Sequence, residues 1–288
     1  MASTIILKHR IKSIKNTRQI TKAMQLVSAS KLRRAQEYAM QSRAYADLAN
    51  ELLVRLSGVA EVERQPLFAK RDVKSRLYVV ITSNSGLAGA YNSNVLKRLA
   101  AGLKEDKDQK VASRVIVVGN RGAQFVRRLS GVELLAAYPA LGDHPTANDV
   151  RPLLNTIIDE YKTGAADDVR ILYTKFKSTV SQEALAAQLL PAQALEADKA
   201  IVSTVSTFEP DVETVIDQVT IRLIEAQIWQ SVLESLASEH AMRMVAMKNA
   251  TDNAKELIDD YTMELNTARQ AAITQELAEI TGGAEALK

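Results

Sequence analysis

The run AMRMVAMKNATDNAKELIDDYTMELNTARQAAITQELAEI (241–280) decides the fold, because it contains neither glycine nor proline. It lies within 211–281, a run of 71 residues without either residue, and residues 1–57 form a second such run. Glycine and proline are the strongest helix breakers, and an average helix has only about 11 residues. The two runs therefore predict exceptionally long helices, of roughly 105 and 85 Å at about 1.5 Å per residue.

Both runs also carry the alternating three- and four-residue spacing that is typical of paired helices. The seam of the later run is Leu233, Ala237, His240, Met244, Met247, Thr251, Ala254, Ile258, Tyr261, Leu265 and Ala268, and that of the first is Ala35, Tyr38, Ser42, Tyr45, Ala49, Leu52 and Leu56. The first 36 residues hold nine Lys or Arg and no acid, whereas residues 252–288 hold eight acids and three bases. These opposite charges favour an antiparallel coiled coil of the two terminal helices.

The middle of the chain has a different pattern, in which strands rich in valine and isoleucine alternate with helical stretches. The expected strands are 77–82, 114–119, 169–176 and 200–208, and the expected helices are 92–105, 121–130 and 146–162. The last helix begins with Thr146 and Asp149 at the spacing of a capping box. Alternating strands and helices predict an α/β domain with a largely parallel sheet. The expected fold is therefore a Rossmann-like α/β domain (75–207) inserted between two coiled-coil helices (1–57 and 210–283).

Composition excludes several classes of function. The chain has no cysteine, so disulfides, thiol nucleophiles and cysteine metal sites are impossible. No stretch approaches the ~18 consecutive apolar residues of a membrane span, and the N-terminus does not resemble a signal or transit peptide. A net charge of +3 is too small to indicate a polyanionic partner by itself. We expect a soluble protein that docks, at most indirectly, on a membrane complex.

The sequence offers only weak candidates for a catalytic, nucleotide-binding or metal-binding site. The loop SNSGLAGAYN (83–92) follows a strand and opens a helix, as phosphate loops do, but it has neither of the glycine spacings of nucleotide-binding loops. Its glycines are more simply interpreted as turn residues. His9, His144 and His240 each lack a second ligand at metal spacing, and His240 falls on the coiled-coil seam. We expect no catalytic residue, no cofactor and no metal.

Two other functions remain open at this stage. The basic N-terminal helix has the charge to neutralise nucleic-acid phosphates, although it has few aromatics for stacking and its expected partner helix is acidic. A free-standing coiled-coil scaffold would show the same long helices.

Four blocks of the chain resemble the gamma subunit of F-type rotary ATP synthases. They are RIKSIKNTRQITKAMQLVSASKLRRAQ (10–36), SNSGLAGAYN (83–92), RMVAMKNATDNA (243–254) and ARQAAITQELAEITGGA (268–284), and they occur in the family's order. The resemblance implies a rotor shaft: an antiparallel coiled coil turning inside a ring of three alpha and three beta subunits, above an α/β head on the epsilon subunit and the c-ring. Proton flow would turn this shaft and drive ATP synthesis in the beta subunits, so that this chain itself is not an enzyme.

The resemblance also assigns partner contacts. Contacts with the alpha/beta ring carry over to Met24, Arg243, Arg269, Gln270, Thr274 and Glu276, and foot contacts with epsilon and the c-ring to Phe208 and Glu209. Without the resemblance, Met24 would be interpreted as seam packing, and Arg269 and Glu276 as a solvated helix face. Nucleic acid is not an expected partner of such a shaft. A bacterial subunit of this type would be peripheral on the cytoplasmic face of the plasma membrane, held there through the c-ring.

The last residues are expected to form the tip of the shaft. The later run exceeds the first by 14 residues, or roughly 21 Å of helix, so its end extends past its partner. Its small residues face several directions, as a narrow tip surrounded by other subunits requires. We expect Gly282 and Gly283 to end the helix.

Overall fold

The structure is a computed structural model that describes residues 4–57, 66–69, 71–142, 145–192 and 212–286. It divides into two compact units, which are described one at a time. The coil unit comprises Met1–Ser28 with Arg243–Lys288, and the head unit comprises Ala29–Met242. Two helices contribute to both units: α1 (Thr4–Ser57) and α5 (Val212–Ala286). The prediction of two exceptionally long terminal helices is therefore confirmed.

The helices of the coil unit are antiparallel. The guanidinium of Arg10 lies 5.9 Å from the ring centre of Tyr261, and Thr251 Oγ1 donates a hydrogen bond of 2.8 Å to Thr21 Oγ1. As residue numbers rise along α1, the numbers of their contact partners on α5 fall, so the two helices run in opposite directions. Side chains buried in this unit include Leu7, Ile11, Met247, Ala254 and Ile258. The predicted seam of the later helix is confirmed at Met247, Thr251, Ala254 and Ile258, which are all buried.

The head unit contains a five-stranded sheet in the order β3-β2-β1-β4-β5. Its strands are β1 (Ser75–Ile81), β2 (Ala112–Val118), β3 (Glu133–Tyr138), β4 (Asp168–Phe176) and β5 (Gln182–Leu190). The first four strands are parallel and β5 pairs antiparallel with β4. Its other helices are α2 (Tyr91–Gln109), α3 (Asn120–Val126), the short 3-10 helix η2 (Ala147–Val150) and α4 (Arg151–Lys162).

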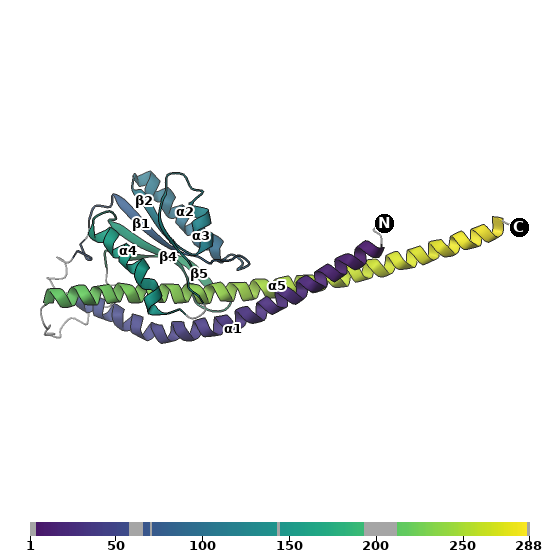
Figure 1. The fold of residues 1–288 in the computed structure, drawn as a ribbon, viewed down its shortest axis with the longest axis horizontal. Helices are drawn as coiled ribbons and strands as arrows, with labels where there is room; N and C mark the ends of the chain where they lie inside the picture. Colours follow the sequence, from purple (N-terminus) through teal and green to yellow (C-terminus); the bar gives the residue numbers. More distant parts are fainter. Residues whose placement is uncertain (1–3, 58–65, 70, 143–144, 193–211, 287–288) are drawn as a thin grey trace. The chain divides into compact units, whose positions relative to one another are not determined.

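Helices cover both faces of this sheet (Figure 1). Alternation along β1 assigns the faces: Leu77, Val79 and Ile81 pack with α4 and the first part of α5, whereas Tyr78 and Val80 pack with α2 and α3. The valine- and isoleucine-rich strands are buried on both sides, as parallel strands between two helix layers must be. The predicted Rossmann-like α/β domain is confirmed, and its first core includes residues of α5.

Three of the four expected strands and all three expected helices are present. The fourth expected strand, 200–208, lies outside the described residues. Two strands were not predicted, β3 (ELLAAY) and β5 (QEALAAQLL), because alanine, leucine, glutamine and glutamate favour helix. Both form the edges of the sheet, where pairing with a single neighbour overrides the local preference.

Two details of the long helices differ from expectation. The expected end of α5 at Gly282 and Gly283 is wrong, because the helix continues to Ala286. A glycine costs a helix about 1 kcal/mol relative to alanine, which disfavours the helix without forbidding it. Among the α1 residues of the head unit whose burial is described, Leu32, Ala35 and Ala39 are buried, and Ala35 belongs to the expected seam. Burial at the seam positions Tyr45, Ala49, Leu52 and Leu56 lies outside the described residues.

Candidate functional site

A buried polar joint fastens the sheet of the head unit to α5. Thr174 lies beyond Leu172, the last β4 residue that pairs with β1, so its backbone has no strand partner on that side. Helix α5 supplies the missing partners: Ser238 Oγ donates to Thr174 O at 3.1 Å, and Thr174 N donates to Ser235 Oγ at 3.4 Å. Ser235 Oγ also lies 2.6 Å from the hydroxyl of Tyr91 at the start of α2. The joint thus links β4, α2 and α5.

This joint occupies the place where doubly wound folds bind their ligands. Such folds bind ligands outside the carboxyl ends of the strands, where the strand order reverses direction. In the order β3-β2-β1-β4-β5 the reversal lies between β1 and β4. Thr174 stands at that end of β4, and Tyr91 follows the loop that leaves β1. The serines of α5 therefore take the position that a ligand takes in other members of this architecture.

A second set of contacts between α5 and β4 surrounds Tyr173. Burial, followed by the negative charge of Glu234, raises the pKa of Tyr173 to about 12. A hydrogen bond with Ser231 acts in the opposite direction on this pKa. These contacts again join β4 to α5.

The loops at the carboxyl edge of the sheet are held together by Asn84. Its Oδ1 accepts hydrogen bonds from Ala140 N at 3.1 Å and from Asn120 N at 3.3 Å, and its Nδ2 donates to Ala140 O at 3.2 Å. One side chain thereby connects the loops that follow β1, β2 and β3. In the first of these loops Gly89 has a φ of 56°, which agrees with the interpretation of its glycines as turn residues.

A buried ion cluster fixes the opposite edge of the sheet. Arg76 on β1 pairs with Asp106 on α2, and its Nε donates to Asp168 Oδ2 on β4 at 2.6 Å. Tyr78 and Ser113 donate to Asp106 at 2.7 and 2.9 Å. Burial and then the hydrogen bond to Asp106 raise the pKa of Tyr78 above its usual value. Each carboxylate is paired with a cation, and Asp106 accepts two further hydroxyl donors, whereas Asp168 Oδ1 is buried without a hydrogen-bond partner among the described residues. The cluster is therefore a structural ion network.

The coil unit has an exposed tip. Arg10 lies beside Tyr261, so the start of α1 at Thr4 falls opposite Thr267. Beyond Thr267, α5 continues for about 19 residues, or roughly 28 Å, with no described residue of α1 beside it. Every residue from 271 to 284 is exposed, including Ile273, Leu277 and Ile280. This helix end leaves apolar side chains uncovered on several faces.

The residues assigned to ring contacts have different environments. Arg269, Gln270, Thr274 and Glu276 are exposed on the tip, and Thr274 Oγ1 bonds back to Gln270 O at 3.0 Å. Met24 is half-buried on α1, and its carbonyl accepts a hydrogen bond of 2.8 Å from Ser28. Arg243 is buried in this chain. Phe208 and Glu209 lie outside the described residues. The structure thus brings four of the eight residues together, on one exposed helix end.

Sequence reasoning missed a basic groove on the coil unit. Lys15, Arg18 and Lys22 lie along one side of α1, and they line a groove of about 690 Å³ together with Lys255 of α5. Asp252 is the single acid among the lining residues, and Ala23 and Leu26 provide apolar surface. The signal was the spacing of these three cations, which puts them on one helix face. The serines of the polar joint were also missed, although Ser231, Ser235 and Ser238 interrupt an otherwise apolar helix face.

The described residues lack two kinds of feature. Among these residues no three histidine, aspartate or glutamate side chains are grouped as metal ligands would be. Within the same part of the chain, no helix combines the length and the apolar character needed to cross a membrane.

Comparison with known proteins gives a consistent result. A family profile described as ATP synthase matches residues 3–287. The ATP synthase gamma chains of Ralstonia nicotianae and Acidithiobacillus ferrooxidans are 39% and 40% identical, over 100% of both chains in each case. A chain of the Euglena gracilis mitochondrial ATP synthase aligns with a TM-score of 0.68 at 20% identity, over 99% of this chain and 94% of that chain. A chain from the central stalk and c-ring structure of the Tetrahymena thermophila enzyme aligns with a TM-score of 0.63 at 23% identity, over 80% and 99%.

Proposed function

Because this chain belongs to the ATP synthase gamma-chain family, we propose that its coil unit turns inside a ring of three alpha and three beta subunits, and that its head unit receives torque from the epsilon subunit and the c-ring. The chain is the central-stalk rotor of a proton-translocating F-type ATP synthase. Its family membership gives no support to the alternatives of a free coiled-coil scaffold or a nucleic-acid-binding protein.

The observation that carries the proposal is the exposed tip of α5. A soluble helix normally buries one apolar face, yet residues 271–284 are exposed all round and include Ile280 at 68% exposure. Exposed apolar side chains on several faces of one helix are explained by a partner that surrounds the helix. A ring of subunits around a narrow shaft end has this geometry.

The basic groove indicates the charge of the surface that faces the coil unit. Four cations and one acid line it, so an acidic segment of the ring is its complement. Such electrostatic complementarity directs association and fixes register more than it adds affinity. Met24 lies on the same helix, between groove residues Lys22 and Leu26. We assign Met24, Arg243, Arg269, Gln270, Thr274 and Glu276 to contacts with the ring on the basis of the family resemblance.

Torque transfer requires the head unit to be held firmly by α5. The polar joint at Ser235 and Ser238 supports this requirement, because it ties β4 and α2 to the helix through buried hydrogen bonds. In this proposal ATP is made and hydrolysed in the beta subunits, and the gamma-type chain itself is non-catalytic. The assembled complex would hold the chain peripherally at the cytoplasmic face of a bacterial plasma membrane. The foot contacts at Phe208 and Glu209 remain part of the proposal.

Reconstitution tests this assignment. The purified full-length chain is mixed with the alpha and beta subunits of the same organism, and both assembly and cooperative ATP hydrolysis are measured. We expect a stable complex whose ATP-driven rotation is seen by a bead attached to the head unit. An alpha–beta ring that forms and hydrolyses ATP with no bound chain would contradict the proposal.

A matched pair of variants tests the groove within the same assay. Arg18→Gln with Lys22→Gln removes two groove cations, whereas Lys8→Gln with Lys12→Gln removes two exposed cations from the same helix outside the groove. We expect the first pair to slow assembly several-fold at low salt and the second to change it little. Equal effects of the two pairs would contradict a specific role for the groove.

A further inference from the structure

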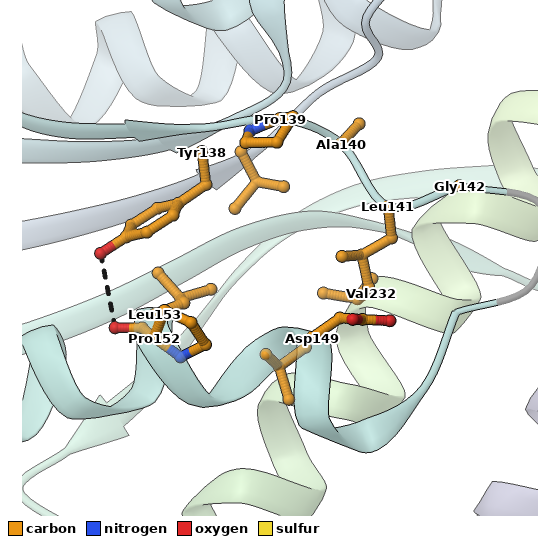
Figure 2. Close-up of a pocket in the computed structure, with 11 residues that line it drawn as sticks. Tyr138, Pro139, Ala140, Leu141, Gly142, Asp149, Pro152, Leu153 and Val232 are labelled. Atoms are coloured by element: carbon orange, nitrogen blue, oxygen red, sulfur yellow. Dashed lines mark hydrogen bonds between the residues drawn. The ribbon is translucent and has the colours of Figure 1, made fainter.

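A cavity of about 380 Å³ lies at the carboxyl edge of the sheet, beside the polar joint and separate from it. Its walls are the ends of β2 and β3 at Val118 and Tyr138, the loop 139–142, the first turn of α4 at Leu153, and Val232 of α5 (Figure 2). All of these residues belong to the head unit. Both its volume and its position outside the carboxyl ends of parallel strands are typical of small-molecule sites.

Apart from the carboxylate of Asp149, the interior of this cavity is largely apolar, because other polar groups of its walls are already bonded. The hydroxyl of Tyr138 lies 2.8 Å from Thr156 Oγ1. It also donates a hydrogen bond of 3.4 Å to Pro152 O, which is the dashed line in Figure 2. The backbone N–H and C=O of Ala140 both bond to Asn84. The side chains of Leu153 and Val232 add aliphatic surface. In this part of the cavity an occupant therefore gains burial of its apolar surface rather than hydrogen bonds.

One carboxylate stands at the mouth of the cavity. Figure 2 shows Asp149 with Leu141 and Val232 on the side of the cavity opposite Tyr138. Asp149 Oδ2 accepts hydrogen bonds from Thr146 N at 2.7 Å and from Thr146 Oγ1 at 2.9 Å. The carboxylate is exposed, and neither of these bonds uses its Oδ1. It can therefore accept a further donor, and its charge favours a cation.

The size of the cavity decides the kind of occupant. An α-helix with its side chains is about 10 Å across and rises 5.4 Å per turn, so even one turn occupies roughly 420 Å³. The cavity holds about 380 Å³ and is bounded by a loop, two helices and two strand ends. It therefore fits a compact molecule better than a helical segment of a partner.

We propose that this cavity binds a small amine with an apolar aromatic or aliphatic body. The body lies between Tyr138, Leu153 and Val232, and the ammonium group donates to Asp149 Oδ1. Because Val232 belongs to α5 and the other walls belong to the sheet and α4, the bound molecule bridges α5 and the rest of the head unit. Binding then stabilises the attachment of the head unit to this helix.

The experiment uses the full-length chain with tryptamine as the probe, followed by saturation-transfer NMR and thermal unfolding. Indole-3-propionate has the same ring with a carboxylate in place of the amine. We expect tryptamine to bind and to raise the unfolding temperature, and indole-3-propionate to bind at least ten-fold more weakly. Equal binding of the two molecules would overturn the assignment of Asp149.

Five variants locate the site. Leu153→Trp fills the cavity and should abolish binding, with Val232→Phe as a second filling variant if the first does not fold. Asp149→Asn should weaken binding about ten-fold, whereas Asp108→Asn, which changes an exposed aspartate on α2, should not. Thr146→Val removes one hydrogen bond to Asp149 and keeps the carboxylate, so it should retain binding. Binding that survives a folded filling variant would place the amine elsewhere and overturn the proposal.

A further experiment measures tryptamine binding to the assembled ATP synthase, and its outcome does not depend on the proposed ring contacts. We expect tryptamine to bind the complex as it binds the chain. Loss of binding on assembly would mean that a partner side chain occupies the cavity, and it would overturn the small-molecule assignment while leaving the rotor role intact.

Discussion

The hydroxyl of Tyr91 lies 2.6 Å from Ser235 Oγ, and both side chains are buried where α5 meets the carboxyl edge of the sheet. Replacing Ser235 with alanine removes one partner of this hydroxyl and leaves the buried N–H of Thr174 without its described partner. A buried unsatisfied polar group costs about 1–3 kcal/mol. We expect Ser235→Ala to lower the free energy of unfolding of the full-length chain by this amount, as measured by denaturant titration.

The double variant Tyr91→Phe with Ser235→Ala serves as the control. It removes both members of the pair, so the combined loss should be smaller than the sum of the two single losses. In the assembled enzyme we expect Ser235→Ala to reduce coupling between proton flow and ATP synthesis, since the joint holds the head unit to α5. Strictly additive losses would show that the two hydroxyls do not interact.

Breaking the buried ion cluster at Arg76 should lower the free energy of unfolding more than Ser235→Ala does. Arg76→Met leaves Asp106 and Asp168 buried without this cation, and breaking a buried pair in this way costs about 3–5 kcal/mol. The matched control is Arg33→Met, because the Arg33 side chain is 86% exposed and pairs with Glu37 at 3.5 Å. Such a surface pair contributes at most about 0.5 kcal/mol. The unfolding temperature should fall much further in Arg76→Met than in Arg33→Met. A similar small loss of stability in both variants would contradict the buried network.

The hydrogen bond between Thr21 and Thr251 lies within the seam of the coil unit. Each hydroxyl also bonds to its own helix, Thr21 to Arg18 O and Thr251 to Met247 O. Replacing both with valine exchanges the polar pair for an apolar one of the same shape, which is close to neutral for stability. We expect each single Thr→Val variant to lose about 0.5–1.5 kcal/mol and the double variant to lose less than their sum. The free energies of unfolding of the two single variants and the double variant are measured by circular dichroism during urea unfolding.

Met24→Lys tests the assignment of Met24 to the ring. The new cation would lie near acidic groups of the beta subunits and form an ion pair that resists rotation. We expect ATP-driven rotation to slow and coupling to fall. Met40→Lys is the matched control, since Met40 is on the same helix, is 73% exposed and has no assigned ring contact. Unchanged torque and coupling in Met24→Lys would show that the assignment is wrong.

The tip of α5 is expected to matter for assembly and little for folding. Residues 271–284 are exposed, so deletion of residues 283–288 removes no described residue that is buried. We expect the truncated chain to keep its helicity, apart from the few deleted residues, and to bind the alpha–beta ring more weakly in gel filtration. A large loss of helicity in the truncated chain would contradict the interpretation of the tip.

Much of the fold follows from local patterns in the sequence. The breaker-free runs predicted α1 and α5, and the valine- and isoleucine-rich runs predicted β1, β2 and β4, since their composition allows few other structures. The edge strands β3 and β5 could not be predicted, because their residues favour helix and only pairing with a neighbouring strand makes them extended. The helix end at Gly282 was wrong because a glycine lowers helix stability only modestly.

The sequence by itself determined the long helices, the α/β class of the head and, through its characteristic blocks, the family. Only the tertiary structure decided how these parts meet. The pairing of Thr21 with Thr251, the hydrogen bonds of Ser235 to β4 and α2, and the cavity beside Val232 each join residues far apart in the chain. Spacing along a sequence reports which residues share one face of one element. Which faces meet depends on burial and hydrogen bonding between elements, and these exist only in the folded chain.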